Sequence, residues 1–261
     1  MARSPDLCEL LDAHWRYFAS TLSTGTKVID LGCGAGAAGR ALHSFEPGLR
    51  ITGVDIAQVP TSNRPGLELV SNVPMESLPF ESGAFGAAVS QFGFEYGNHN
   101  SAAREMARVL ASGAPFSLLI HHPESPIVAD MRRHRRAIED LCGLRVQAAF
   151  FSGNANALAE RFAVLKRECS GDPIVEHAER GLQSHIRQDA NGRLQIWRAV
   201  ADALVPELVM LDSLDLCCAE EGDIPDHVEP LTEWFDVRLP AVLRTRSGEP
   251  IAWEIHGNRL S

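Results

Sequence analysis

The sequence lacks several features that would assign it to a specialised class of protein. It has no run of about 18 apolar residues, so a membrane-spanning helix is excluded. None of its six cysteines forms a CxxC pair, so we expect no metal, haem or redox-disulfide site, and reduced thiols as in the cytoplasm. Basic residues number 24 against 34 acidic ones, a net charge of -10, which disfavours nucleic acid as a partner. Two acids precede the first apolar run, so no secretory signal is expected.

What the sequence does contain is the size and composition of an ordinary globular chain. It has 261 residues, 45% hydrophobic and 22% charged, which suits one large domain or a domain with one insertion. Ser4 followed by Pro5 predicts the start of a helix over residues 5–22. Strands then alternate with helices. The expected strands are 28–31, 51–55, 67–70, 85–91 and 116–121, and the expected helices are 37–45 and 101–110. Apolar strands that alternate with helices predict a parallel sheet covered by helices on both faces.

The alternation stops after residue 123 and returns to strand near the C-terminus. Residues 124–224 show apolar stripes at helical spacing. The expected helices are 125–142, 154–169, 172–186, 194–204 and 207–221, with a turn at Asn191-Gly192. Two further strands, 234–246 and 251–256, flank a short turn and predict an antiparallel hairpin. We therefore divide the chain into an N-terminal helix (1–24), an α/β core (25–123 with 225–261) and a helical insertion (124–224).

The most informative stretch is the glycine-rich loop after the first strand. It contains Gly34-x-Gly36-x-x-Gly39, a pattern that dinucleotide-binding proteins also use. Asp30 stands immediately before these glycines, and its carboxylate would repel a pyrophosphate. A ligand with an ammonium group and no phosphate fits better, and S-adenosylmethionine is such a ligand. Asp55, at the end of the second strand, could accept hydrogen bonds from ribose hydroxyls in either cofactor.

These motifs together resemble one known family. Asp30-x-Gly32-x-Gly34-x-Gly36, then an acid after the second strand at Asp55, then Glu76-Ser-Leu-Pro-Phe80 before the fourth strand, are similar to class I S-adenosylmethionine-dependent methyltransferases of the small-molecule, bacterial type. The resemblance covers residues 25–122 and, in outline, the terminal hairpin. It implies a doubly wound, mostly parallel seven-stranded sheet of Rossmann-like type, with the last strand inserted antiparallel. The cofactor would lie across the carboxyl ends of the first strands.

The resemblance also implies which residues bind the cofactor. Asp30 and the glycine loop would hold the methionine part, Asp55 the ribose, and Ile56 and Met75 the two faces of the adenine. The full cofactor set is Asp30, Gly32, Cys33, Gly34, Gly36, Asp55, Ile56, Met75, Glu76 and Gln91. One departure concerns the adenine amino group: Pro74 replaces the usual aspartate, which leaves Glu76, Asn72 or a backbone carbonyl as its acceptor.

Four residues near the ends of the fourth and fifth strands are candidates for catalysis. Glu95 and Tyr96 follow the fourth strand, and the glycine at 93 would allow close approach of the backbone there. His121 and His122 close the fifth strand, and a histidine suits removal of an acceptor's proton near pH 7. At most one of the two histidines should face the site, because successive strand side chains point in opposite directions. The alternative is a structural histidine that bonds to backbone.

The insertion predicts a substrate lid. Its candidate acceptor contacts are Phe150, Phe151, Phe162, Trp197 and Arg132, although stripes at helical spacing are usually core. The basic run Arg132–Arg136 is followed by acids at i+3 and i+4, which favours a solvated, paired face. We therefore expect a cytoplasmic methyltransferase that acts on an oxygen, nitrogen or carbon atom of a small-molecule acceptor, with a homodimer as an open option. A nicotinamide-dependent oxidoreductase and a non-catalytic cofactor-binding partner are the alternatives.

Overall fold

The computed structural model describes residues 5–169, 172–218 and 224–261. The predicted N-cap Ser4 therefore lies outside the described residues. The chain divides into two compact units. The first, here called the α/β unit, comprises residues 1–125 and 217–261, and the second, the helical unit, comprises residues 126–216. In the part of the chain that the structure describes, no helix combines the length and apolar character that crossing a bilayer requires.

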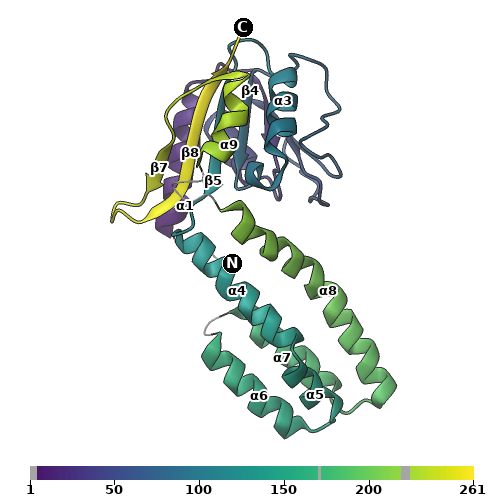
Figure 1. The fold of residues 1–261 in the computed structure, drawn as a ribbon. Helices are drawn as coiled ribbons and strands as arrows, with labels where there is room; N and C mark the ends of the chain where they lie inside the picture. Colours follow the sequence, from purple (N-terminus) through teal and green to yellow (C-terminus); the bar gives the residue numbers. More distant parts are fainter. Residues whose placement is uncertain (1–4, 170–171, 219–223) are drawn as a thin grey trace. The chain divides into compact units, whose positions relative to one another are not determined.

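The α/β unit is built on one mixed sheet (Figure 1). Its strands are β1 (Lys27–Leu31), β2 (Arg50–Val54), β3 (Leu67–Val70), β4 (Ala87–Gln91), β5 (Pro115–His121), β6 (Phe235–Val237), β7 (Ala241–Arg244) and β8 (Pro250–Arg259). The order is β3-β2-β1-β4-β5-β8-β6, with β7 paired to β8. Strands β1 to β5 run parallel, and β8 pairs antiparallel with β5. The expected α/β fold is confirmed, but the sheet has eight strands where seven were expected. The strand order reverses beside β1, where such sheets bind ligands.

The C-terminal strands differ from the expectation in one respect. The single predicted strand 234–246 is wrong: β6 and β7 are separate, and Leu239-Pro240 lies between them. Proline has no N–H for the ladder, which ends strand pairing at this point. The turn before β8 is confirmed, because Gly248 has a φ of 89° and its N–H donates to the Thr245 carbonyl at 2.9 Å.

Helices of the α/β unit flank the sheet. They are α1 (Pro5–Ser20), α2 (Ala37–Phe45), the short 3-10 helix η1 (Phe94–Tyr96), α3 (His99–Val109) and α9 (Ile224–Thr232). Helix α1 packs with α2, and α3 packs with α9. Helix α3 begins two residues earlier than predicted because the Asn98 side chain accepts a hydrogen bond from Ser101 N at 3.0 Å and caps the helix. The sequence analysis missed α9, a short helix with Pro230 inside it.

The helical unit consists of α4 (Pro126–Cys142), α5 (Leu144–Phe151), α6 (Ala155–Glu168), α7 (Pro173–His185) and α8 (Ala190–Cys217). Helix α5 was not predicted. The predicted turn at Asn191-Gly192 is wrong: both residues lie in the first turn of α8, and Asp189 Oδ1 accepts from Gly192 N at 2.8 Å. The predicted helices 194–204 and 207–221 are one helix as far as Cys217, with Pro206 inside it. Residues 219–221 of that prediction lie outside the described residues.

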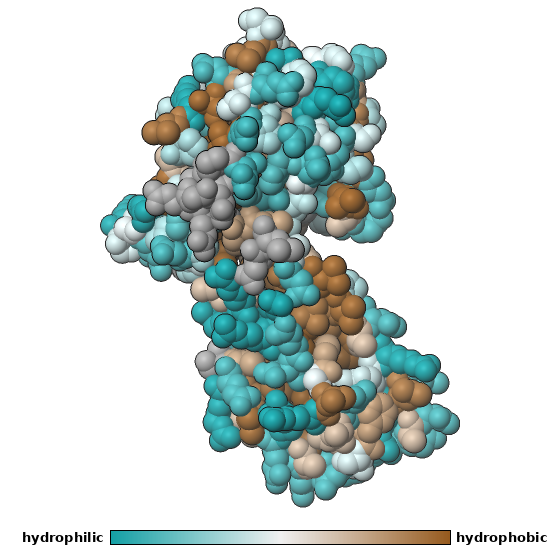
Figure 2. Space-filling model, viewed as in Figure 1, coloured by the Kyte–Doolittle hydropathy of each residue, from teal (hydrophilic) through white to brown (hydrophobic). Residues whose placement is uncertain are grey.

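Packing in the helical unit changes the set of candidate acceptor contacts. Phe150 and Phe162 are fully buried in one apolar cluster, and Trp197 is nearly so. These three side chains form the unit's own core, so the expectation that they contact an acceptor is corrected. Phe151 is only partly buried against that core. Figure 2 shows apolar side chains gathered on part of the helical unit's surface. The exposed large apolar residues of this unit include Val205, Val209 and Met210 of α8.

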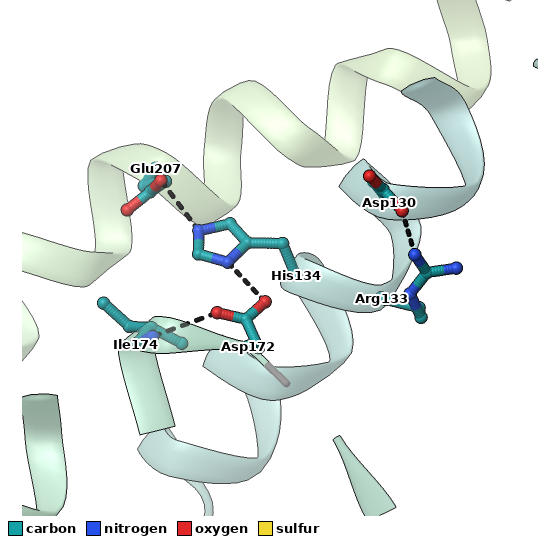
Figure 3. A network of polar contacts seen from close by, with 6 residues as sticks. All are labelled: Asp130, Arg133, His134, Asp172, Ile174 and Glu207. Atoms are coloured by element: carbon teal, nitrogen blue, oxygen red, sulfur yellow. Dashed lines mark hydrogen bonds and ion pairs between the residues drawn. The ribbon is translucent and has the colours of Figure 1, made fainter. Parts of the chain in front are cut away.

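The basic run on α4 is a paired face, as predicted. Arg133 pairs with Asp130, and Arg135 Nε lies 3.2 Å from Glu139 Oε1. The histidine inside the run has a different role. His134 Nδ1 lies 2.8 Å from Asp172 Oδ2, and its Nε2 lies 2.9 Å from Glu207 Oε1 (Figure 3). This one imidazole therefore links α4, the N-cap of α7 and α8.

Candidate active site

The glycine loop that follows β1 has a backbone conformation that residues other than glycine rarely adopt. Gly32, Gly34 and Gly36 have φ values of 63°, 49° and 76°. This left-handed region is accessible to glycine without steric cost, which explains the spacing of the motif. The chain turns sharply at the carboxyl end of β1, and Gly36 forms the N-cap of α2. Backbone N–H groups of the loop and the start of α2 thus lie at the sheet edge where a carboxylate can bind.

Asp30 lies under this loop with an unsatisfied carboxylate oxygen. The residue is 1% exposed, and its Oδ2 accepts a hydrogen bond from Gly39 N at 3.2 Å. Its buried Oδ1 has no hydrogen-bond partner among the described residues. Burial, with a contribution from the nearby charge of Asp55, raises the pKa of Asp30 to about 7. A buried carboxylate of this kind is stabilised when a cationic donor reaches it, so the site fits a ligand with an ammonium group.

Asp55 follows β2 and supports the same loop. Its Oδ2 accepts from Gly34 N at 2.7 Å, and its Oδ1 accepts from Ala57 N at 2.9 Å. Both carboxylate oxygens are therefore engaged by backbone, although each has a second lone pair for a ribose hydroxyl. The sequence analysis gave Asp55 only a ligand role and missed its bond to the glycine loop.

The loops after β1 and β4 touch through two glycines. A Cβ atom on Gly93 would lie 2.6 Å from the Gly32 carbonyl oxygen, and one on Gly32 would lie 2.9 Å from Gly93 Cα. The close approach expected at Gly93 is therefore to Gly32 rather than to a ligand. The neighbouring Phe92 has a φ of 59°, a strained value for an aromatic residue. The structure thus brings the glycine loop and the end of β4 to one place.

The remaining predicted cofactor residues lie on loops around this edge. Cys33 is buried, and burial raises the pKa of its thiol, so it stays protonated. Met75 packs against the core of the unit, whereas Ile56 is 72% exposed. Glu76 Oε1 accepts from Asn98 N at 2.7 Å, and Gln91 Oε1 accepts from the Trp15 indole at 2.6 Å.

Asn72, the other acceptor considered for adenine, has a φ of 60° and its Oδ1 accepts from Gln58 Nε2 at 3.2 Å. Asn72 and Phe92 are the only non-glycine residues with positive φ in the described chain. Both follow strands of the sheet, β3 and β4, on the edge that carries the glycine loop. Backbone strain in this structure therefore gathers at the candidate site, as is common for functional sites.

His121, the last residue of β5, and Glu95, in η1 after β4, form a buried pair. Glu95 Oε1 accepts from the His121 backbone N at 3.0 Å and lies 2.8 Å from His121 Nδ1. The ring of His121 stacks on Phe92, with centroids 4.3 Å apart and an interplanar angle of 23°. An ionised carboxylate can only accept hydrogen bonds, so an ionised Glu95 places a proton on Nδ1 of His121.

The other two catalytic candidates have different surroundings. The ring of His122 lies 5.0 Å from that of Trp253, and its Nδ1 accepts from Glu124 N at 3.2 Å. The two histidines thus have separate neighbours, as strand alternation predicts. Tyr96 is partly exposed and lies edge-on to His121 with centroids 6.3 Å apart. Burial and the charge of Glu95 raise the pKa of the Tyr96 hydroxyl, so it stays protonated.

Residues 29–118, the span from β1 to the middle of β5, match the family model described as a methyltransferase domain. This part of the chain is therefore similar to a methyltransferase domain, in agreement with the resemblance found in the sequence. S-adenosylmethionine is the cofactor of this family, and the unsatisfied oxygen of Asp30 fits its ammonium group. No curated protein matches the chain.

Several solved methyltransferase structures are similar to the chain at low sequence identity. One from Aquifex aeolicus is 11% identical, with 98% of this chain and 94% of that chain covered and a TM-score of 0.49. One from Methanosarcina mazei is 18% identical, with 94% and 97% covered and a TM-score of 0.44. One from Mesorhizobium loti is 23% identical, with 44% and 58% covered and a TM-score of 0.35.

Another similar chain comes from a complex between the Haloferax volcanii Trm112 methyltransferase activator and a methyltransferase. It is 23% identical, with 50% of this chain and 65% of that chain covered and a TM-score of 0.37. The present chain thus spans 65% of that chain and 58% of the Mesorhizobium loti structure. Both shares are below two thirds. The family match, and not these structures, carries the assignment of the methyltransferase domain.

Proposed function

We propose that the protein transfers the methyl group of S-adenosylmethionine to an oxygen or nitrogen atom of a small organic acceptor in the cytoplasm. The observation that carries this proposal is the buried Asp30 carboxylate, whose Oδ1 lacks a partner among the described residues at the foot of a left-handed glycine loop. A cationic ammonium satisfies that oxygen, whereas a pyrophosphate is repelled by it. The same observation disfavours a nicotinamide dinucleotide.

The chain's own residues divide into those that bind and those that orient. Asp30 would accept from the ligand's ammonium, and the N–H groups of the glycine loop would donate to its carboxylate. Asp55 would accept from the ribose hydroxyls while it holds Gly34 in place. When bound, S-adenosylmethionine supplies a methyl group that its sulfonium already activates. The protein then has chiefly to hold the acceptor in line with that methyl group.

His121 is the proposed general base. Its Nε2 carries the lone pair, and Glu95 holds Nδ1 and the backbone of the same residue through one oxygen. An acceptor hydroxyl or amine that gives its proton to Nε2 becomes a better nucleophile, and the imidazolium that forms is stabilised by the adjacent Glu95 carboxylate. In this arrangement Glu95 is a positioning residue rather than the base.

The helical unit would supply the acceptor contacts. Its exposed apolar residues on α8, Val205, Val209 and Met210, are the kind of surface that an apolar acceptor or a lid contact buries. Arg132, which lines a cavity of about 480 Å³ with Arg135, Arg136 and Glu139, would suit an acidic group on the acceptor. These contacts, and the role of the unit as a lid, are part of the proposal.

The test measures cofactor binding and turnover separately. Calorimetry should show that S-adenosylmethionine binds the wild-type protein and that nicotinamide dinucleotides do not. A screen of small metabolites with labelled cofactor should then yield a labelled product and one equivalent of S-adenosylhomocysteine. Binding of a nicotinamide dinucleotide at micromolar concentration would contradict the proposal, and so would cofactor binding without turnover of any acceptor in a broad screen.

A further inference from the structure

Three side chains from opposite ends of the chain meet on one face of the α/β unit. His14 belongs to α1, and Glu254 and His256 belong to β8. Their potential ligand atoms all lie within 4.8 Å of one another. Glu254 and His256 share a face because alternate strand residues point the same way. His14 is buried, and the other two side chains are half-buried.

The geometry is close to that of a tetrahedral metal site. Zinc–nitrogen bonds of about 2.0–2.1 Å place ligand atoms roughly 3.3 Å apart and the centroids of two bound imidazoles roughly 5 Å apart. The rings of His14 and His256 have centroids 5.5 Å apart and an interplanar angle of 29°. His14 Nδ1 and Glu254 Oε1 are 2.7 Å apart, so a metal ion would need to widen this one contact by about half an ångström.

The three side chains offer the kinds of atom that bind transition metals. His14 and His256 each supply an imidazole nitrogen, and Glu254 supplies a carboxylate oxygen. Metal ions bind ionised carboxylates and neutral imidazoles.

A fourth residue contacts the His14 ring at the nitrogen that faces away from Glu254. His14 Nε2 lies 3.0 Å from the hydroxyl of Ser117, a fully buried residue of β5. Histidines that bind metals usually make such a bond with their second nitrogen, which fixes the ring and its tautomer. The contact therefore leaves Nδ1, the nitrogen nearest Glu254, as the ligand atom.

We propose that His14, Glu254 and His256 bind one divalent first-row transition metal ion, with zinc as the best match. Two imidazoles and one carboxylate are a donor set that zinc accepts readily, whereas magnesium and calcium prefer oxygen ligands alone. The sequence gave no sign of this site, because His14 lies 240 residues before Glu254.

The proposed ion would connect α1 to the sheet. Trp15, which follows His14, donates its indole N–H to Gln91 Oε1 at the end of β4. An ion that fixes His14 would therefore also fix the residue beside the methyltransferase site. The role inferred for the ion is structural, and it does not depend on the proposed methyl transfer.

The experiment is a zinc titration of untagged, chelator-treated protein by calorimetry, with metal analysis of the dialysed complex. The wild type should bind one zinc ion per chain. His256→Ala and Glu254→Gln should each weaken binding at least tenfold, and Ser117→Ala about 10- to 100-fold. Glu254→Gln keeps the shape of the side chain, so it tests the ligand with little risk to folding. His177→Ala, which removes an exposed histidine of α7, is the matched control and should leave binding unchanged.

Cobalt gives a second readout, because tetrahedral Co²⁺ absorbs visible light and octahedral Co²⁺ in water barely does. The wild-type protein should show this band, and His256→Ala should lose it while its circular dichroism stays that of a folded chain. Three results would overturn the proposal. They are a folded wild type that binds no stoichiometric zinc, a zinc affinity equal to that of wild type in both His256→Ala and Glu254→Gln, and a loss of zinc binding in His177→Ala. The last would identify ordinary surface binding.

Discussion

The Asp30 site of the α/β unit and the His134 centre of the helical unit are assembled over different distances along the chain. In the α/β unit, Asp30 and its backbone partner Gly39 are nine residues apart, and one turn of glycines joins them. In the helical unit, His134 is held by Asp172 and Glu207, which lie 38 and 73 residues away. The first centre follows from local backbone geometry, whereas the second exists only after three helices have packed.

The two units also use a histidine in opposite ways. His121 has one carboxylate partner, Glu95, which holds Nδ1 and leaves the lone pair on Nε2. His134 has a carboxylate at each nitrogen, at 2.8 and 2.9 Å. A histidine with one nitrogen left for a ligand suits proton transfer, and one with both nitrogens engaged suits a structural link. The predictions below test this contrast.

The largest expected effect belongs to His121. His121→Gln should lower the rate of methyl transfer by about 10²- to 10⁴-fold, the usual contribution of a general base, and leave cofactor affinity nearly unchanged. Single-turnover kinetics and calorimetry would measure the two quantities. His122→Gln is the matched comparison and should have a much smaller effect, because its ring faces Trp253. Equal losses in both variants would remove the base assignment.

The next effect concerns Asp30 and pH. Because the pKa of Asp30 is raised to about 7, the carboxylate is protonated at lower pH and cannot attract an ammonium. Cofactor affinity should fall about tenfold per pH unit below 7 and level off above it. Asp30→Asn should bind at least tenfold more weakly at pH 7.5 and lose most of this dependence. Calorimetry between pH 5.5 and 7.5 would decide. A wild-type affinity independent of pH would contradict the ammonium role.

Local signals in the sequence were sufficient for the methyltransferase domain. The glycine spacing fixed the turn after β1, since only glycine adopts its φ values without cost. The contact of Gly32 with Gly93 and the bond from Gly34 to Asp55 could not be read from the sequence. Both depend on how β1, β2 and β4 line up in the sheet, which spacing alone does not specify.

The helix boundaries and buried residues of the helical unit were predicted less well, because its sequence patterns fit more than one structure. Asn191-Gly192 has the composition of a turn, yet Asp189 caps the helix there and the chain continues into α8. Pro206 also did not end that helix. A stripe of apolar residues predicts a helix but not its partner, so Phe150 and Phe162 could not be distinguished from ligand contacts before the core was known.

His134 makes the helical unit's stability depend on pH. Burial lowers the pKa of His134, but Asp172 and Glu207 raise it by more, so the net shift is upward from 6.5. The stabilisation is therefore complete below about pH 6.5 and is lost as pH rises through the raised value. His134→Ala should cost about 1.5–3 kcal/mol at pH 6 and less at pH 9. Urea unfolding at several pH values would measure this. A constant difference across that range would show that packing, not charge, is lost.

The smallest expected effect tests whether the helical unit serves the acceptor at all. Val209 and Met210 of α8 are 65% and 49% exposed, and each buried CH₂ group contributes about 0.8 kcal/mol to binding. The double variant Val209→Ser, Met210→Ser should raise the KM for an apolar acceptor roughly three- to tenfold. Cofactor affinity should not change, because the cofactor's predicted contacts lie in the α/β unit. Glu160→Gln, at an exposed position of α6, is the control and should behave as wild type. If the double variant instead keeps its KM and changes its mass in solution by light scattering, these side chains pair two copies of the chain. The acceptor would then be recognised by the α/β unit alone.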